Sequence, residues 1–272
     1  MQFVLFSCQK DKAMEGQGIQ LPLECNASEE FSIHYYLHLF AIDRDNRIAR
    51  HETFTSSHIH DNTLHAILPL GRYRLALVAN APEESIVIPE TGEALESLFL
   101  CLPHEENTNQ EANDISTALQ SVSITESKNT LPPIRLFRRT GVVLFSLHAI
   151  PEAISNLKLE LSFVPSSVSF SGSTTNTFGT ITKPVDHQGK AMIRTFPTKK
   201  GEATLSITYD EDNKSKRKII PFSEAIDTNQ IIHVDCNFPE LTEGGIQGNG
   251  ENLLQNGDFE KWSNPTIEPD NW

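Results

Sequence analysis

The stretch that decides the fold is Phe31-Ser-Ile-His-Tyr-Tyr-Leu-His-Leu-Phe-Ala-Ile42, which runs into the polar Asp43-Arg-Asp-Asn46. Every second side chain is apolar on one face of an extended chain: Ile33, Tyr35, Leu37, Leu39 and Ala41. Because successive side chains of a strand point to opposite faces, this period of two predicts a β-strand. Asp and Asn side chains bond to nearby backbone, so residues 43–46 predict a turn, and Ile48 to Phe54 predicts the return strand.

The same alternation recurs further along the chain. Residues 64–68 alternate into Pro69-Leu70-Gly71 and residues 73–79 alternate out of it, which predicts a β-hairpin. Residues 92–102 are apolar at mixed spacing and predict a short helix. Six more strands are predicted at 141–147, 157–163, 190–196, 203–209, 216–221 and 230–238. Short strands with polar turns, and no alternation of strands with helices, predict an all-β sandwich fold rather than an α/β enzyme.

A polar stretch, residues 104–133, separates two groups of predicted strands and ends in Leu131-Pro132-Pro133. We therefore expect an N-terminal β-sandwich domain over residues 25–133 and a C-terminal one over residues 134–240. The glycine-rich residues 244–250 predict a flexible linker, so residues 241–272 are expected to be a linker and a partial C-terminal module.

Composition and motifs limit the function. The chain has 272 residues and a formal net charge of −14, which argues against a nucleic-acid partner because phosphate backbones are bound by clustered Lys and Arg. It contains no GxSxG, no HExxH and no phosphate-binding glycine loop, so we predict no catalytic residue and no cofactor. A glycosidase stays an alternative, because its two carboxylates can lie far apart in the sequence.

Two clusters deserve comparison with metal sites. His58-Ile-His60, with His51 and His65, could present imidazole ligands, but no acidic or thiolate partner has a recognisable spacing. The segment from Asp43 to Asn46 lacks the glycine and the distant glutamate of a calcium-binding loop. We therefore predict no metal site, and a hairpin turn at residues 43–46.

The first residues, Met1-Gln-Phe-Val-Leu-Phe-Ser-Cys8, are apolar and end on a small residue before cysteine. Leu5-Phe-Ser-Cys8 resembles a bacterial lipobox, in which the cysteine is freed at its amino side and acylated. The resemblance implies a residual lipoprotein signal at residues 1–7, a lipid on Cys8, and a tether over residues 8–24. A buried first strand with a core cysteine is the alternative.

The order of these features resembles the anchor and tip subunits of Bacteroidetes fimbrillin-type (type V) pili. The lipobox, the strand ending at Asp43, the segment Leu68–Asn80, Arg138-Arg139-Thr-Gly141 and Asn229 carry the resemblance. It implies two tandem transthyretin-like, Greek-key β-sandwich domains, no catalysis, and a location on the outer membrane through the lipid. It also implies that the partners are other fimbrial subunits, joined by donor-strand exchange, in which a strand from a neighbour completes an open sheet.

The last predicted strand, residues 230–238, is the candidate edge for that exchange. A sheet edge exposes unpaired N–H and C=O groups that a partner strand satisfies along its length. Ile232, Val234 and Cys236 alternate on one face of this strand, and we expect them to be its inward anchors.

The end of the chain supports a second hypothesis. Asn252-Leu-Leu-Gln-Asn-Gly-Asp-Phe-Glu-Lys-Trp262 and Glu268-Pro-Asp-Asn-Trp272 resemble the first strand of jelly-roll carbohydrate-binding modules. Trp262 and Trp272 are candidates for stacking on a host or environmental glycan. The alternative function is then a surface glycan-binding lipoprotein of a polysaccharide-utilisation system, and a disordered tail is the simpler interpretation.

Overall fold

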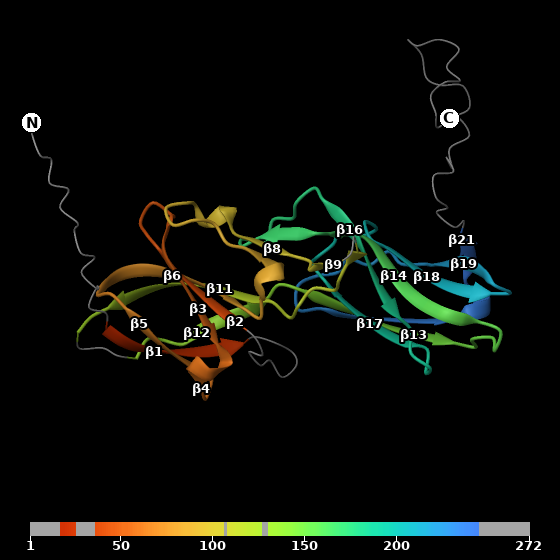
Figure 1. The fold of residues 1–272 in the computed structure, drawn as a ribbon, viewed down its shortest axis with the longest axis horizontal. Coiled ribbons are helices and arrows are strands. Elements are labelled where there is room, and N and C mark those ends of the chain that lie inside the picture. The colour runs from red at the N-terminus through yellow and green to blue at the C-terminus, as the bar shows by residue number, and fades with distance from the viewer. Residues whose placement is uncertain (1–16, 26–35, 106–107, 127–129, 245–272) are drawn as a thin grey trace, which may run out of the picture.

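The computed structural model describes residues 17–25, 36–105, 108–126 and 130–244. Almost all regular structure in these ranges is β-strand. The helical elements described are short 3-10 turns, at Ser56–His58, Glu83–Ser85, Leu95–Ser97 and Phe238–Glu240. The strands form two groups that follow one another along the long axis of the molecule (Figure 1). The predicted all-β sandwich class is confirmed.

The first group of strands has the order β3-β2-β6-β11-β12-β1-β5-β4. Strands from both ends of this order bury side chains in one core, so the sheet doubles over into a sandwich. Leu21, Leu37, Leu64 and Leu75 are fully buried in that core. The strands are β1 (Gln17–Cys25), β2 (Tyr36–Ile42), β3 (Ile48–Thr55), β4 (Ile59–His60), β5 (Thr63–Leu68), β6 (Gly71–Ala79), β11 (Ser116–Ile124) and β12 (Ile134–Arg138).

Strands β5 and β6 lie where they were predicted, but the predicted hairpin between them is wrong. Strand β5 pairs with β1 and β4, whereas β6 pairs with β2 and β11. The link at residues 69–70 therefore carries the chain from one layer of the sandwich to the other. Leu64, Ala66 and Leu68 of β5 and Leu75, Leu77 and Ala79 of β6 pack in the same core from these two layers.

Strand β1 lies in the middle of the first group, between β12 and β5. Its Ile19, Leu21 and Leu23 are buried, so the expected tether over residues 8–24 is wrong for residues 17–24. These three residues alternate with a period of two, which is typical of a strand. The alternation was overlooked because the segment follows the lipobox and was assigned to the tether. The rest of the expected tether, the residual signal and Cys8 lie outside the described residues.

The second group consists of a seven-stranded sheet, β21-β19-β18-β14-β16-β10-β9, and a three-stranded sheet, β17-β13-β20. Phe145, Leu161, Phe196 and Leu205 fill the core between them. The strands are β9 (His104–Glu105), β10 (Thr108–Asn109), β13 (Gly141–His148), β14 (Ser155–Pro165), β16 (Phe178–Pro184), β17 (Lys190–Thr195), β18 (Thr204–Glu211), β19 (Lys214–Ile220), β20 (Ile231–Asn237) and β21 (Thr242–Gly244). Strand β21 extends the sheet into residues expected to be linker.

The two groups share strands where they meet. In a small third sheet, β8 (Phe99–Cys101) pairs with β7 (Ile86–Val87) and with β15 (Ser167–Ser169). Strand β10 pairs with β16 in the seven-stranded sheet of the second group. In the sequence, however, β10 comes before β11 and β12, which belong to the first group. The short helix predicted at residues 92–102 is instead a single 3-10 turn followed by β8.

The domain boundary expected at residue 133 does not match the strand pairing. The polar stretch 104–133 supplies β9 and β10 to the second group and β11 to the first, and β12 beyond it also joins the first group. Leu119, Ser121 and Ser123 are exposed on one face of β11, and the polar residues made a central strand look like a linker. A continuous apolar core runs from Phe40 and Val78 in the first group to Leu205 in the second.

The chain leaves the first group for the last time at Arg138, which is only 5% exposed. Its Nε lies 2.6 Å from Oδ1 of Asp114, and its Nη2 donates to Oδ2 at 2.9 Å. Its Nη1 also donates to Oδ1 of Asn229, which precedes β20. The next residue, Arg139, donates to Oγ1 of Thr117 and to the carbonyl of Phe170. The two arginines therefore fasten both groups at their junction.

Replacing Arg138 with alanine should lower the free energy of unfolding by about 2 to 4 kcal/mol, because it leaves the Asp114 carboxylate without its partner. Urea denaturation followed by circular dichroism measures the change. The matched control is Arg135→Ala, which removes an arginine whose side chain is 73% exposed and whose partner is Glu24. That variant should lose less than about 1 kcal/mol. Equal losses in the two variants would contradict the structural role of Arg138.

Candidate functional site

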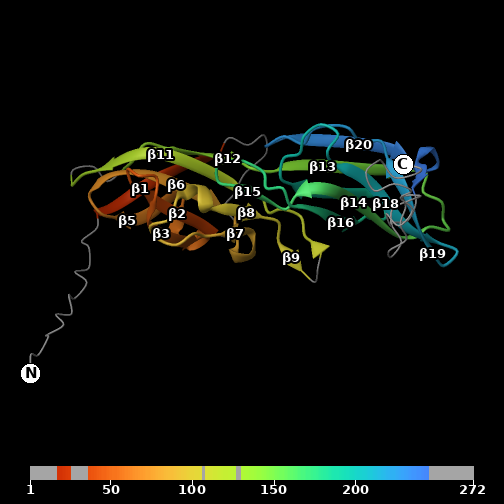
Figure 2. The same cartoon turned by 90° about the horizontal axis from the view of Figure 1, so that it is seen from above.

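Strand β20 is an edge of the three-stranded sheet. It pairs in parallel with β13 along its whole length, from Val142 opposite Ile231 to His148 opposite Asn237. Within the described ranges no other strand pairs with β20, so one side of it is free. Figure 2 shows β20 beside β13 at the outer border of the second group.

The register determines which backbone groups face the free side. The Val142 N–H donates to the Gln230 carbonyl at 2.9 Å. In a parallel pair, alternate residues of a strand bond to the neighbour, so the backbone groups of Ile232, Val234 and Cys236 face β13. The N–H and C=O groups of the residues between them, such as His233 and Asp235, therefore point away from β13 and are open to a partner strand.

The side chains of β20 alternate between core and solvent. Ile232 is buried, and Val234 and Cys236 are half-buried and pack against the core of the second group. His233 and Asp235 are exposed. The structure thus places the three predicted anchors on one apolar face, and a strand added beside β20 would cover what remains exposed of it. Their role in strand exchange stays a prediction.

The Cys236 thiol behaves as an apolar group. Burial, followed by the nearby Asp235 and Glu240 carboxylates, raises the pKa of Cys236 to about 11. Burial also raises the pKa of Cys101, and both cysteines are free thiols. A protonated thiol is a poor nucleophile, so neither cysteine is chemically activated at neutral pH.

Other long edges of the described sheets differ from β20. Strand β3 carries two charged residues, Arg50 and Glu52, which form an ion pair, whereas β20 carries one, Asp235, beside His148. Charged side chains discourage pairing at an edge. The outer side of β17 is partly used, because the Arg194 carbonyl accepts from the Ala112 N–H and the Arg194 N–H donates to Glu111. Strand β20 therefore combines an unused backbone edge with an apolar row.

The histidines considered as metal ligands do not converge. His58 accepts the Thr55 N–H through Nδ1, and the rings of His60 and His65 lie 6.1 Å apart. His51 packs elsewhere, against Phe40 at 4.4 Å between ring centroids. Within the described ranges, no group of three or more His, Cys, Asp or Glu residues is placed to hold a metal ion.

His51 instead forms a pair with the buried His38, which the sequence did not single out. The Nε2 atom of His38 lies 2.8 Å from the Ala81 carbonyl and must donate to it, so in the neutral ring Nδ1 is an acceptor, and both His51 Nε2 and Thr53 Oγ1 lie 3.2 Å from it. Burial lowers the pKa of His38, although the Ala81 carbonyl and Glu83 oppose the shift. Burial and the neighbouring His38 lower the pKa of His51 from 6.5 to about 4.

This pair makes stability depend on pH. In the unfolded chain the two histidines take up protons as the pH falls through 6.5, whereas folded His51 resists protonation until about pH 4. The contribution to stability is therefore complete above pH 6.5 and is lost as the pH falls from 6.5 toward 4. Discounted for partial exposure, His51 should account for about 1 to 2 kcal/mol lost between roughly pH 7 and 5.

Urea unfolding across this range measures the loss, which should shrink in His51→Gln and persist in the control His58→Gln. A slope in His51→Gln equal to that of the wild type would show that the pair is not responsible.

Three candidate residues, Cys8, Trp262 and Trp272, lie outside the described residues, so lipidation and stacking on a glycan stay predictions. In the ranges that the structure does describe, no helix is long and apolar enough to cross a membrane.

The fold and the β20 edge define an all-β protein of two joined sandwiches, in which β20 pairs on one side only within the described ranges. Similar folds occur in solved structures: a candidate polysaccharide-binding protein from Bacteroides thetaiotaomicron has a TM-score of 0.60 at 14% identity, covering 80% of this chain and 90% of that one. A fimbrial assembly protein from Parabacteroides distasonis scores 0.52 at 10% identity, with coverages of 82% and 93%. The fimbrial anchor protein Mfa2 from Porphyromonas gingivalis scores 0.50 at 14% identity, with coverages of 78% and 99%.

Residues 26–272 match the family model of the fimbrillin-A associated anchor proteins Mfa1 and Mfa2, and the chain belongs to this family. The predicted resemblance to fimbrial anchor subunits is thereby confirmed. Among curated proteins, none matches the sequence. Family membership supports a fimbrial anchor or adhesin role at the cell surface and association with other fimbrial subunits.

Proposed function

We propose that the protein is a non-catalytic fimbrial subunit, of anchor or tip type, that joins another fimbrial subunit by adding a strand to the free side of β20. The unpaired edge of β20 carries this proposal, and membership in a family of fimbrial anchor proteins supports it. The same family supports a structural rather than an enzymatic role.

The edge offers two sources of affinity. A partner strand bonds to the outward backbone groups of β20, each bond adding about 0.5 to 1.5 kcal/mol. Its apolar side chains extend the row of Ile232, Val234 and Cys236 and cover the half-exposed members. Because side chains alternate along a strand, a shift by one residue would turn the apolar side chains of the partner to solvent, which fixes the register.

The substitution His233→Pro tests the edge. Proline has no N–H, and at this position it removes a donor on the free side while leaving the bonds to β13 intact. We expect the variant to keep its melting temperature within a few degrees and to lose co-purification with the fimbrillin of the source strain by at least about tenfold.

The matched control is His233→Ala, which removes the same side chain, keeps the donor and should retain capture. Val234→Pro is a poorer test, because it removes a donor that faces β13 and should destabilise the protein itself. If His233→Pro remains folded and still captures the partner, the proposed role of this edge is wrong.

We also propose that the protein is held on the outer membrane by acyl chains on Cys8. The change from Phe-Val-Leu-Phe-Ser to Gln-Lys-Asp-Lys around this cysteine motivates the proposal. Each buried CH₂ contributes about 0.8 kcal/mol, so several chains give lasting attachment.

With a complete export leader supplied, Cys8→Ser should abolish labelling by an alkyne-tagged palmitate and release the protein into the soluble fraction. Cys101→Ser is the control and should leave both the palmitate labelling and the membrane attachment unchanged. Undiminished labelling of the Cys8 variant would rule out this anchor.

A further inference from the structure

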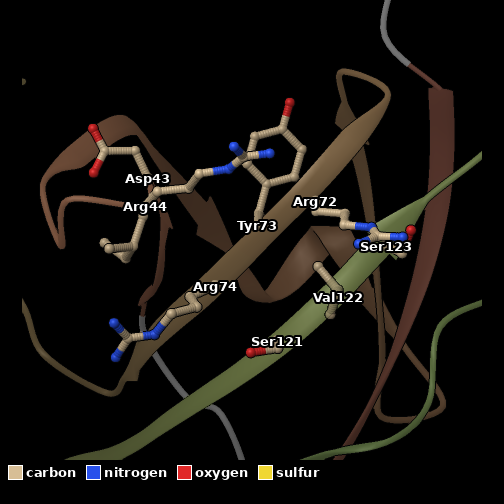
Figure 3. Close-up of a pocket in the computed structure, with 9 residues that line it drawn as sticks. Asp43, Arg44, Arg72, Tyr73, Arg74, Ser121, Val122 and Ser123 are labelled. Carbon is tan, nitrogen blue, oxygen red and sulfur yellow. The ribbon is translucent and has the colours of Figure 1, made fainter.

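A second surface feature lies in the first group, away from β20. It is a pocket of about 590 Å³ on the outer face of the sheet formed by β2, β6 and β11. Arginines and serines dominate its lining, as Figure 3 shows. The lining residues are Ile42, Asp43, Arg44, Arg72, Tyr73, Arg74, Ser121, Val122 and Ser123.

Three arginines and one carboxylate line this pocket, so positive charge is in excess. No ion pair in the described part of the chain involves Arg44, Arg72 or Arg74. The one carboxylate in the lining, that of Asp43, is engaged through Oδ1 by the backbone N–H groups of Asp45 and Arg47 at 2.9 Å each. Three arginines thus gather on one face of a protein whose net charge is −14.

One of these arginines, Arg74, is held by the neutral side chain of Asn46, which is itself held by Glu96. Arg74 donates from Nη1 to Oδ1 of Asn46 at 2.8 Å, and Asn46 donates from Nδ2 to Oε1 of Glu96 at 2.5 Å. These two consecutive hydrogen bonds orient the Arg74 guanidinium. They leave its other N–H groups available, because a guanidinium carries five donors. Orienting a donor in advance reduces the entropy lost when a ligand binds.

The serines lie beside the arginines. In the antiparallel register of β6 and β11, Arg72 faces Ser123 and Arg74 faces Ser121. Each arginine is thus accompanied by a hydroxyl that can donate or accept a hydrogen bond. Guanidinium groups suit carboxylate or sulfate, and serine hydroxyls suit the hydroxyls of a sugar.

The arrangement fits an extended ligand better than a single ion. Arg72 and Arg74 lie two residues apart, or about 6.7 Å along the strand. Figure 3 shows their side chains leaning to opposite sides of β6, while Arg44 extends from the turn after β2. Because the three guanidinium groups lie apart around the pocket, they can contact two or more separate anionic groups of one ligand. A single small anion would require the guanidinium groups to converge on one point.

We propose that this pocket binds an acidic oligosaccharide, that is, a saccharide bearing carboxylate or sulfate groups. The site is on a sheet face and is separate from the β20 edge, so it gives the subunit a ligand of its own in addition to its fimbrial partner. Arg72 and Arg74 bind the anionic groups, and Asn46 is a positioning residue for Arg74.

Isothermal titration calorimetry of the full chain at low ionic strength tests the site with four probes. These are a sulfated tetrasaccharide, a galacturonate tetrasaccharide, a neutral tetrasaccharide and inorganic sulfate. We expect one of the acidic tetrasaccharides to bind at least about tenfold more tightly than the neutral one or the free ion, since charge-assisted bonds form at several points. The acidic probe that binds identifies the anionic group.

Arg72→Gln combined with Arg74→Gln should weaken that binding by at least about tenfold. The control, Arg135→Gln, removes the same charge from an exposed arginine of β12 outside the pocket and should change it less than about twofold. Asn46→Gly keeps the left-handed turn, where φ is 62°, and should cause an intermediate loss. Absence of acidic-saccharide binding, equal loss in Arg135→Gln, or equally tight binding of inorganic sulfate would each overturn the proposal.

Discussion

Backbone N–H and C=O groups need hydrogen-bond partners wherever they are removed from water, and this constraint determines how the strands are distributed. It brings β8 to β15 and β10 to β16, so that short segments from the middle of the chain complete sheets at the junction. The same constraint makes β20 stand out. Its parallel pairing with β13 satisfies only one side, and the other side is left with groups that a further strand can satisfy.

The junction shows how two sandwiches become one elongated body. Apolar side chains from both groups form a continuous core, and the buried Arg138 guanidinium joins Asp114 to Asn229 just before β20 begins. An arginine suits this position because its planar donors can reach two partners at once, which a lysine cannot reproduce. The backbone that leads into the candidate edge is therefore anchored at the place where the two groups meet.

The charge distribution separates two kinds of surface. The chain as a whole is acidic, and a large net charge of one sign discourages non-specific association. Against that background the pocket around Arg72 and Arg74 is locally positive, and screening over about 8 Å at physiological salt lets such a local field act independently of the net charge. The β20 edge, by contrast, depends on backbone groups and an apolar row, so its chemistry suits a protein strand.

The sequence by itself determined many of the strands and the family. A period of two is a local property, so β2, β3, β13, β18 and β20 could be placed from side chains alone, and so could the turn at Asp43. Motif order along the chain identified the relation to fimbrial anchors. The candidate anchors Ile232, Val234 and Cys236 could be assigned to one face of a strand for the same reason.

Only the tertiary structure decided which strands are neighbours. Alternation predicts that β5 and β6 are strands but not that they lie in opposite layers, because pairing depends on residues far away in the chain. Strands with a polar face, such as β11, resemble linkers until their partners are known. The free side of β20 and the arginine pocket arise between segments distant in sequence. The His38–His51 pair lies within one hairpin, but its burial and its contact with the Ala81 carbonyl come from the rest of the fold. Their existence depends on register and packing, which no local pattern encodes.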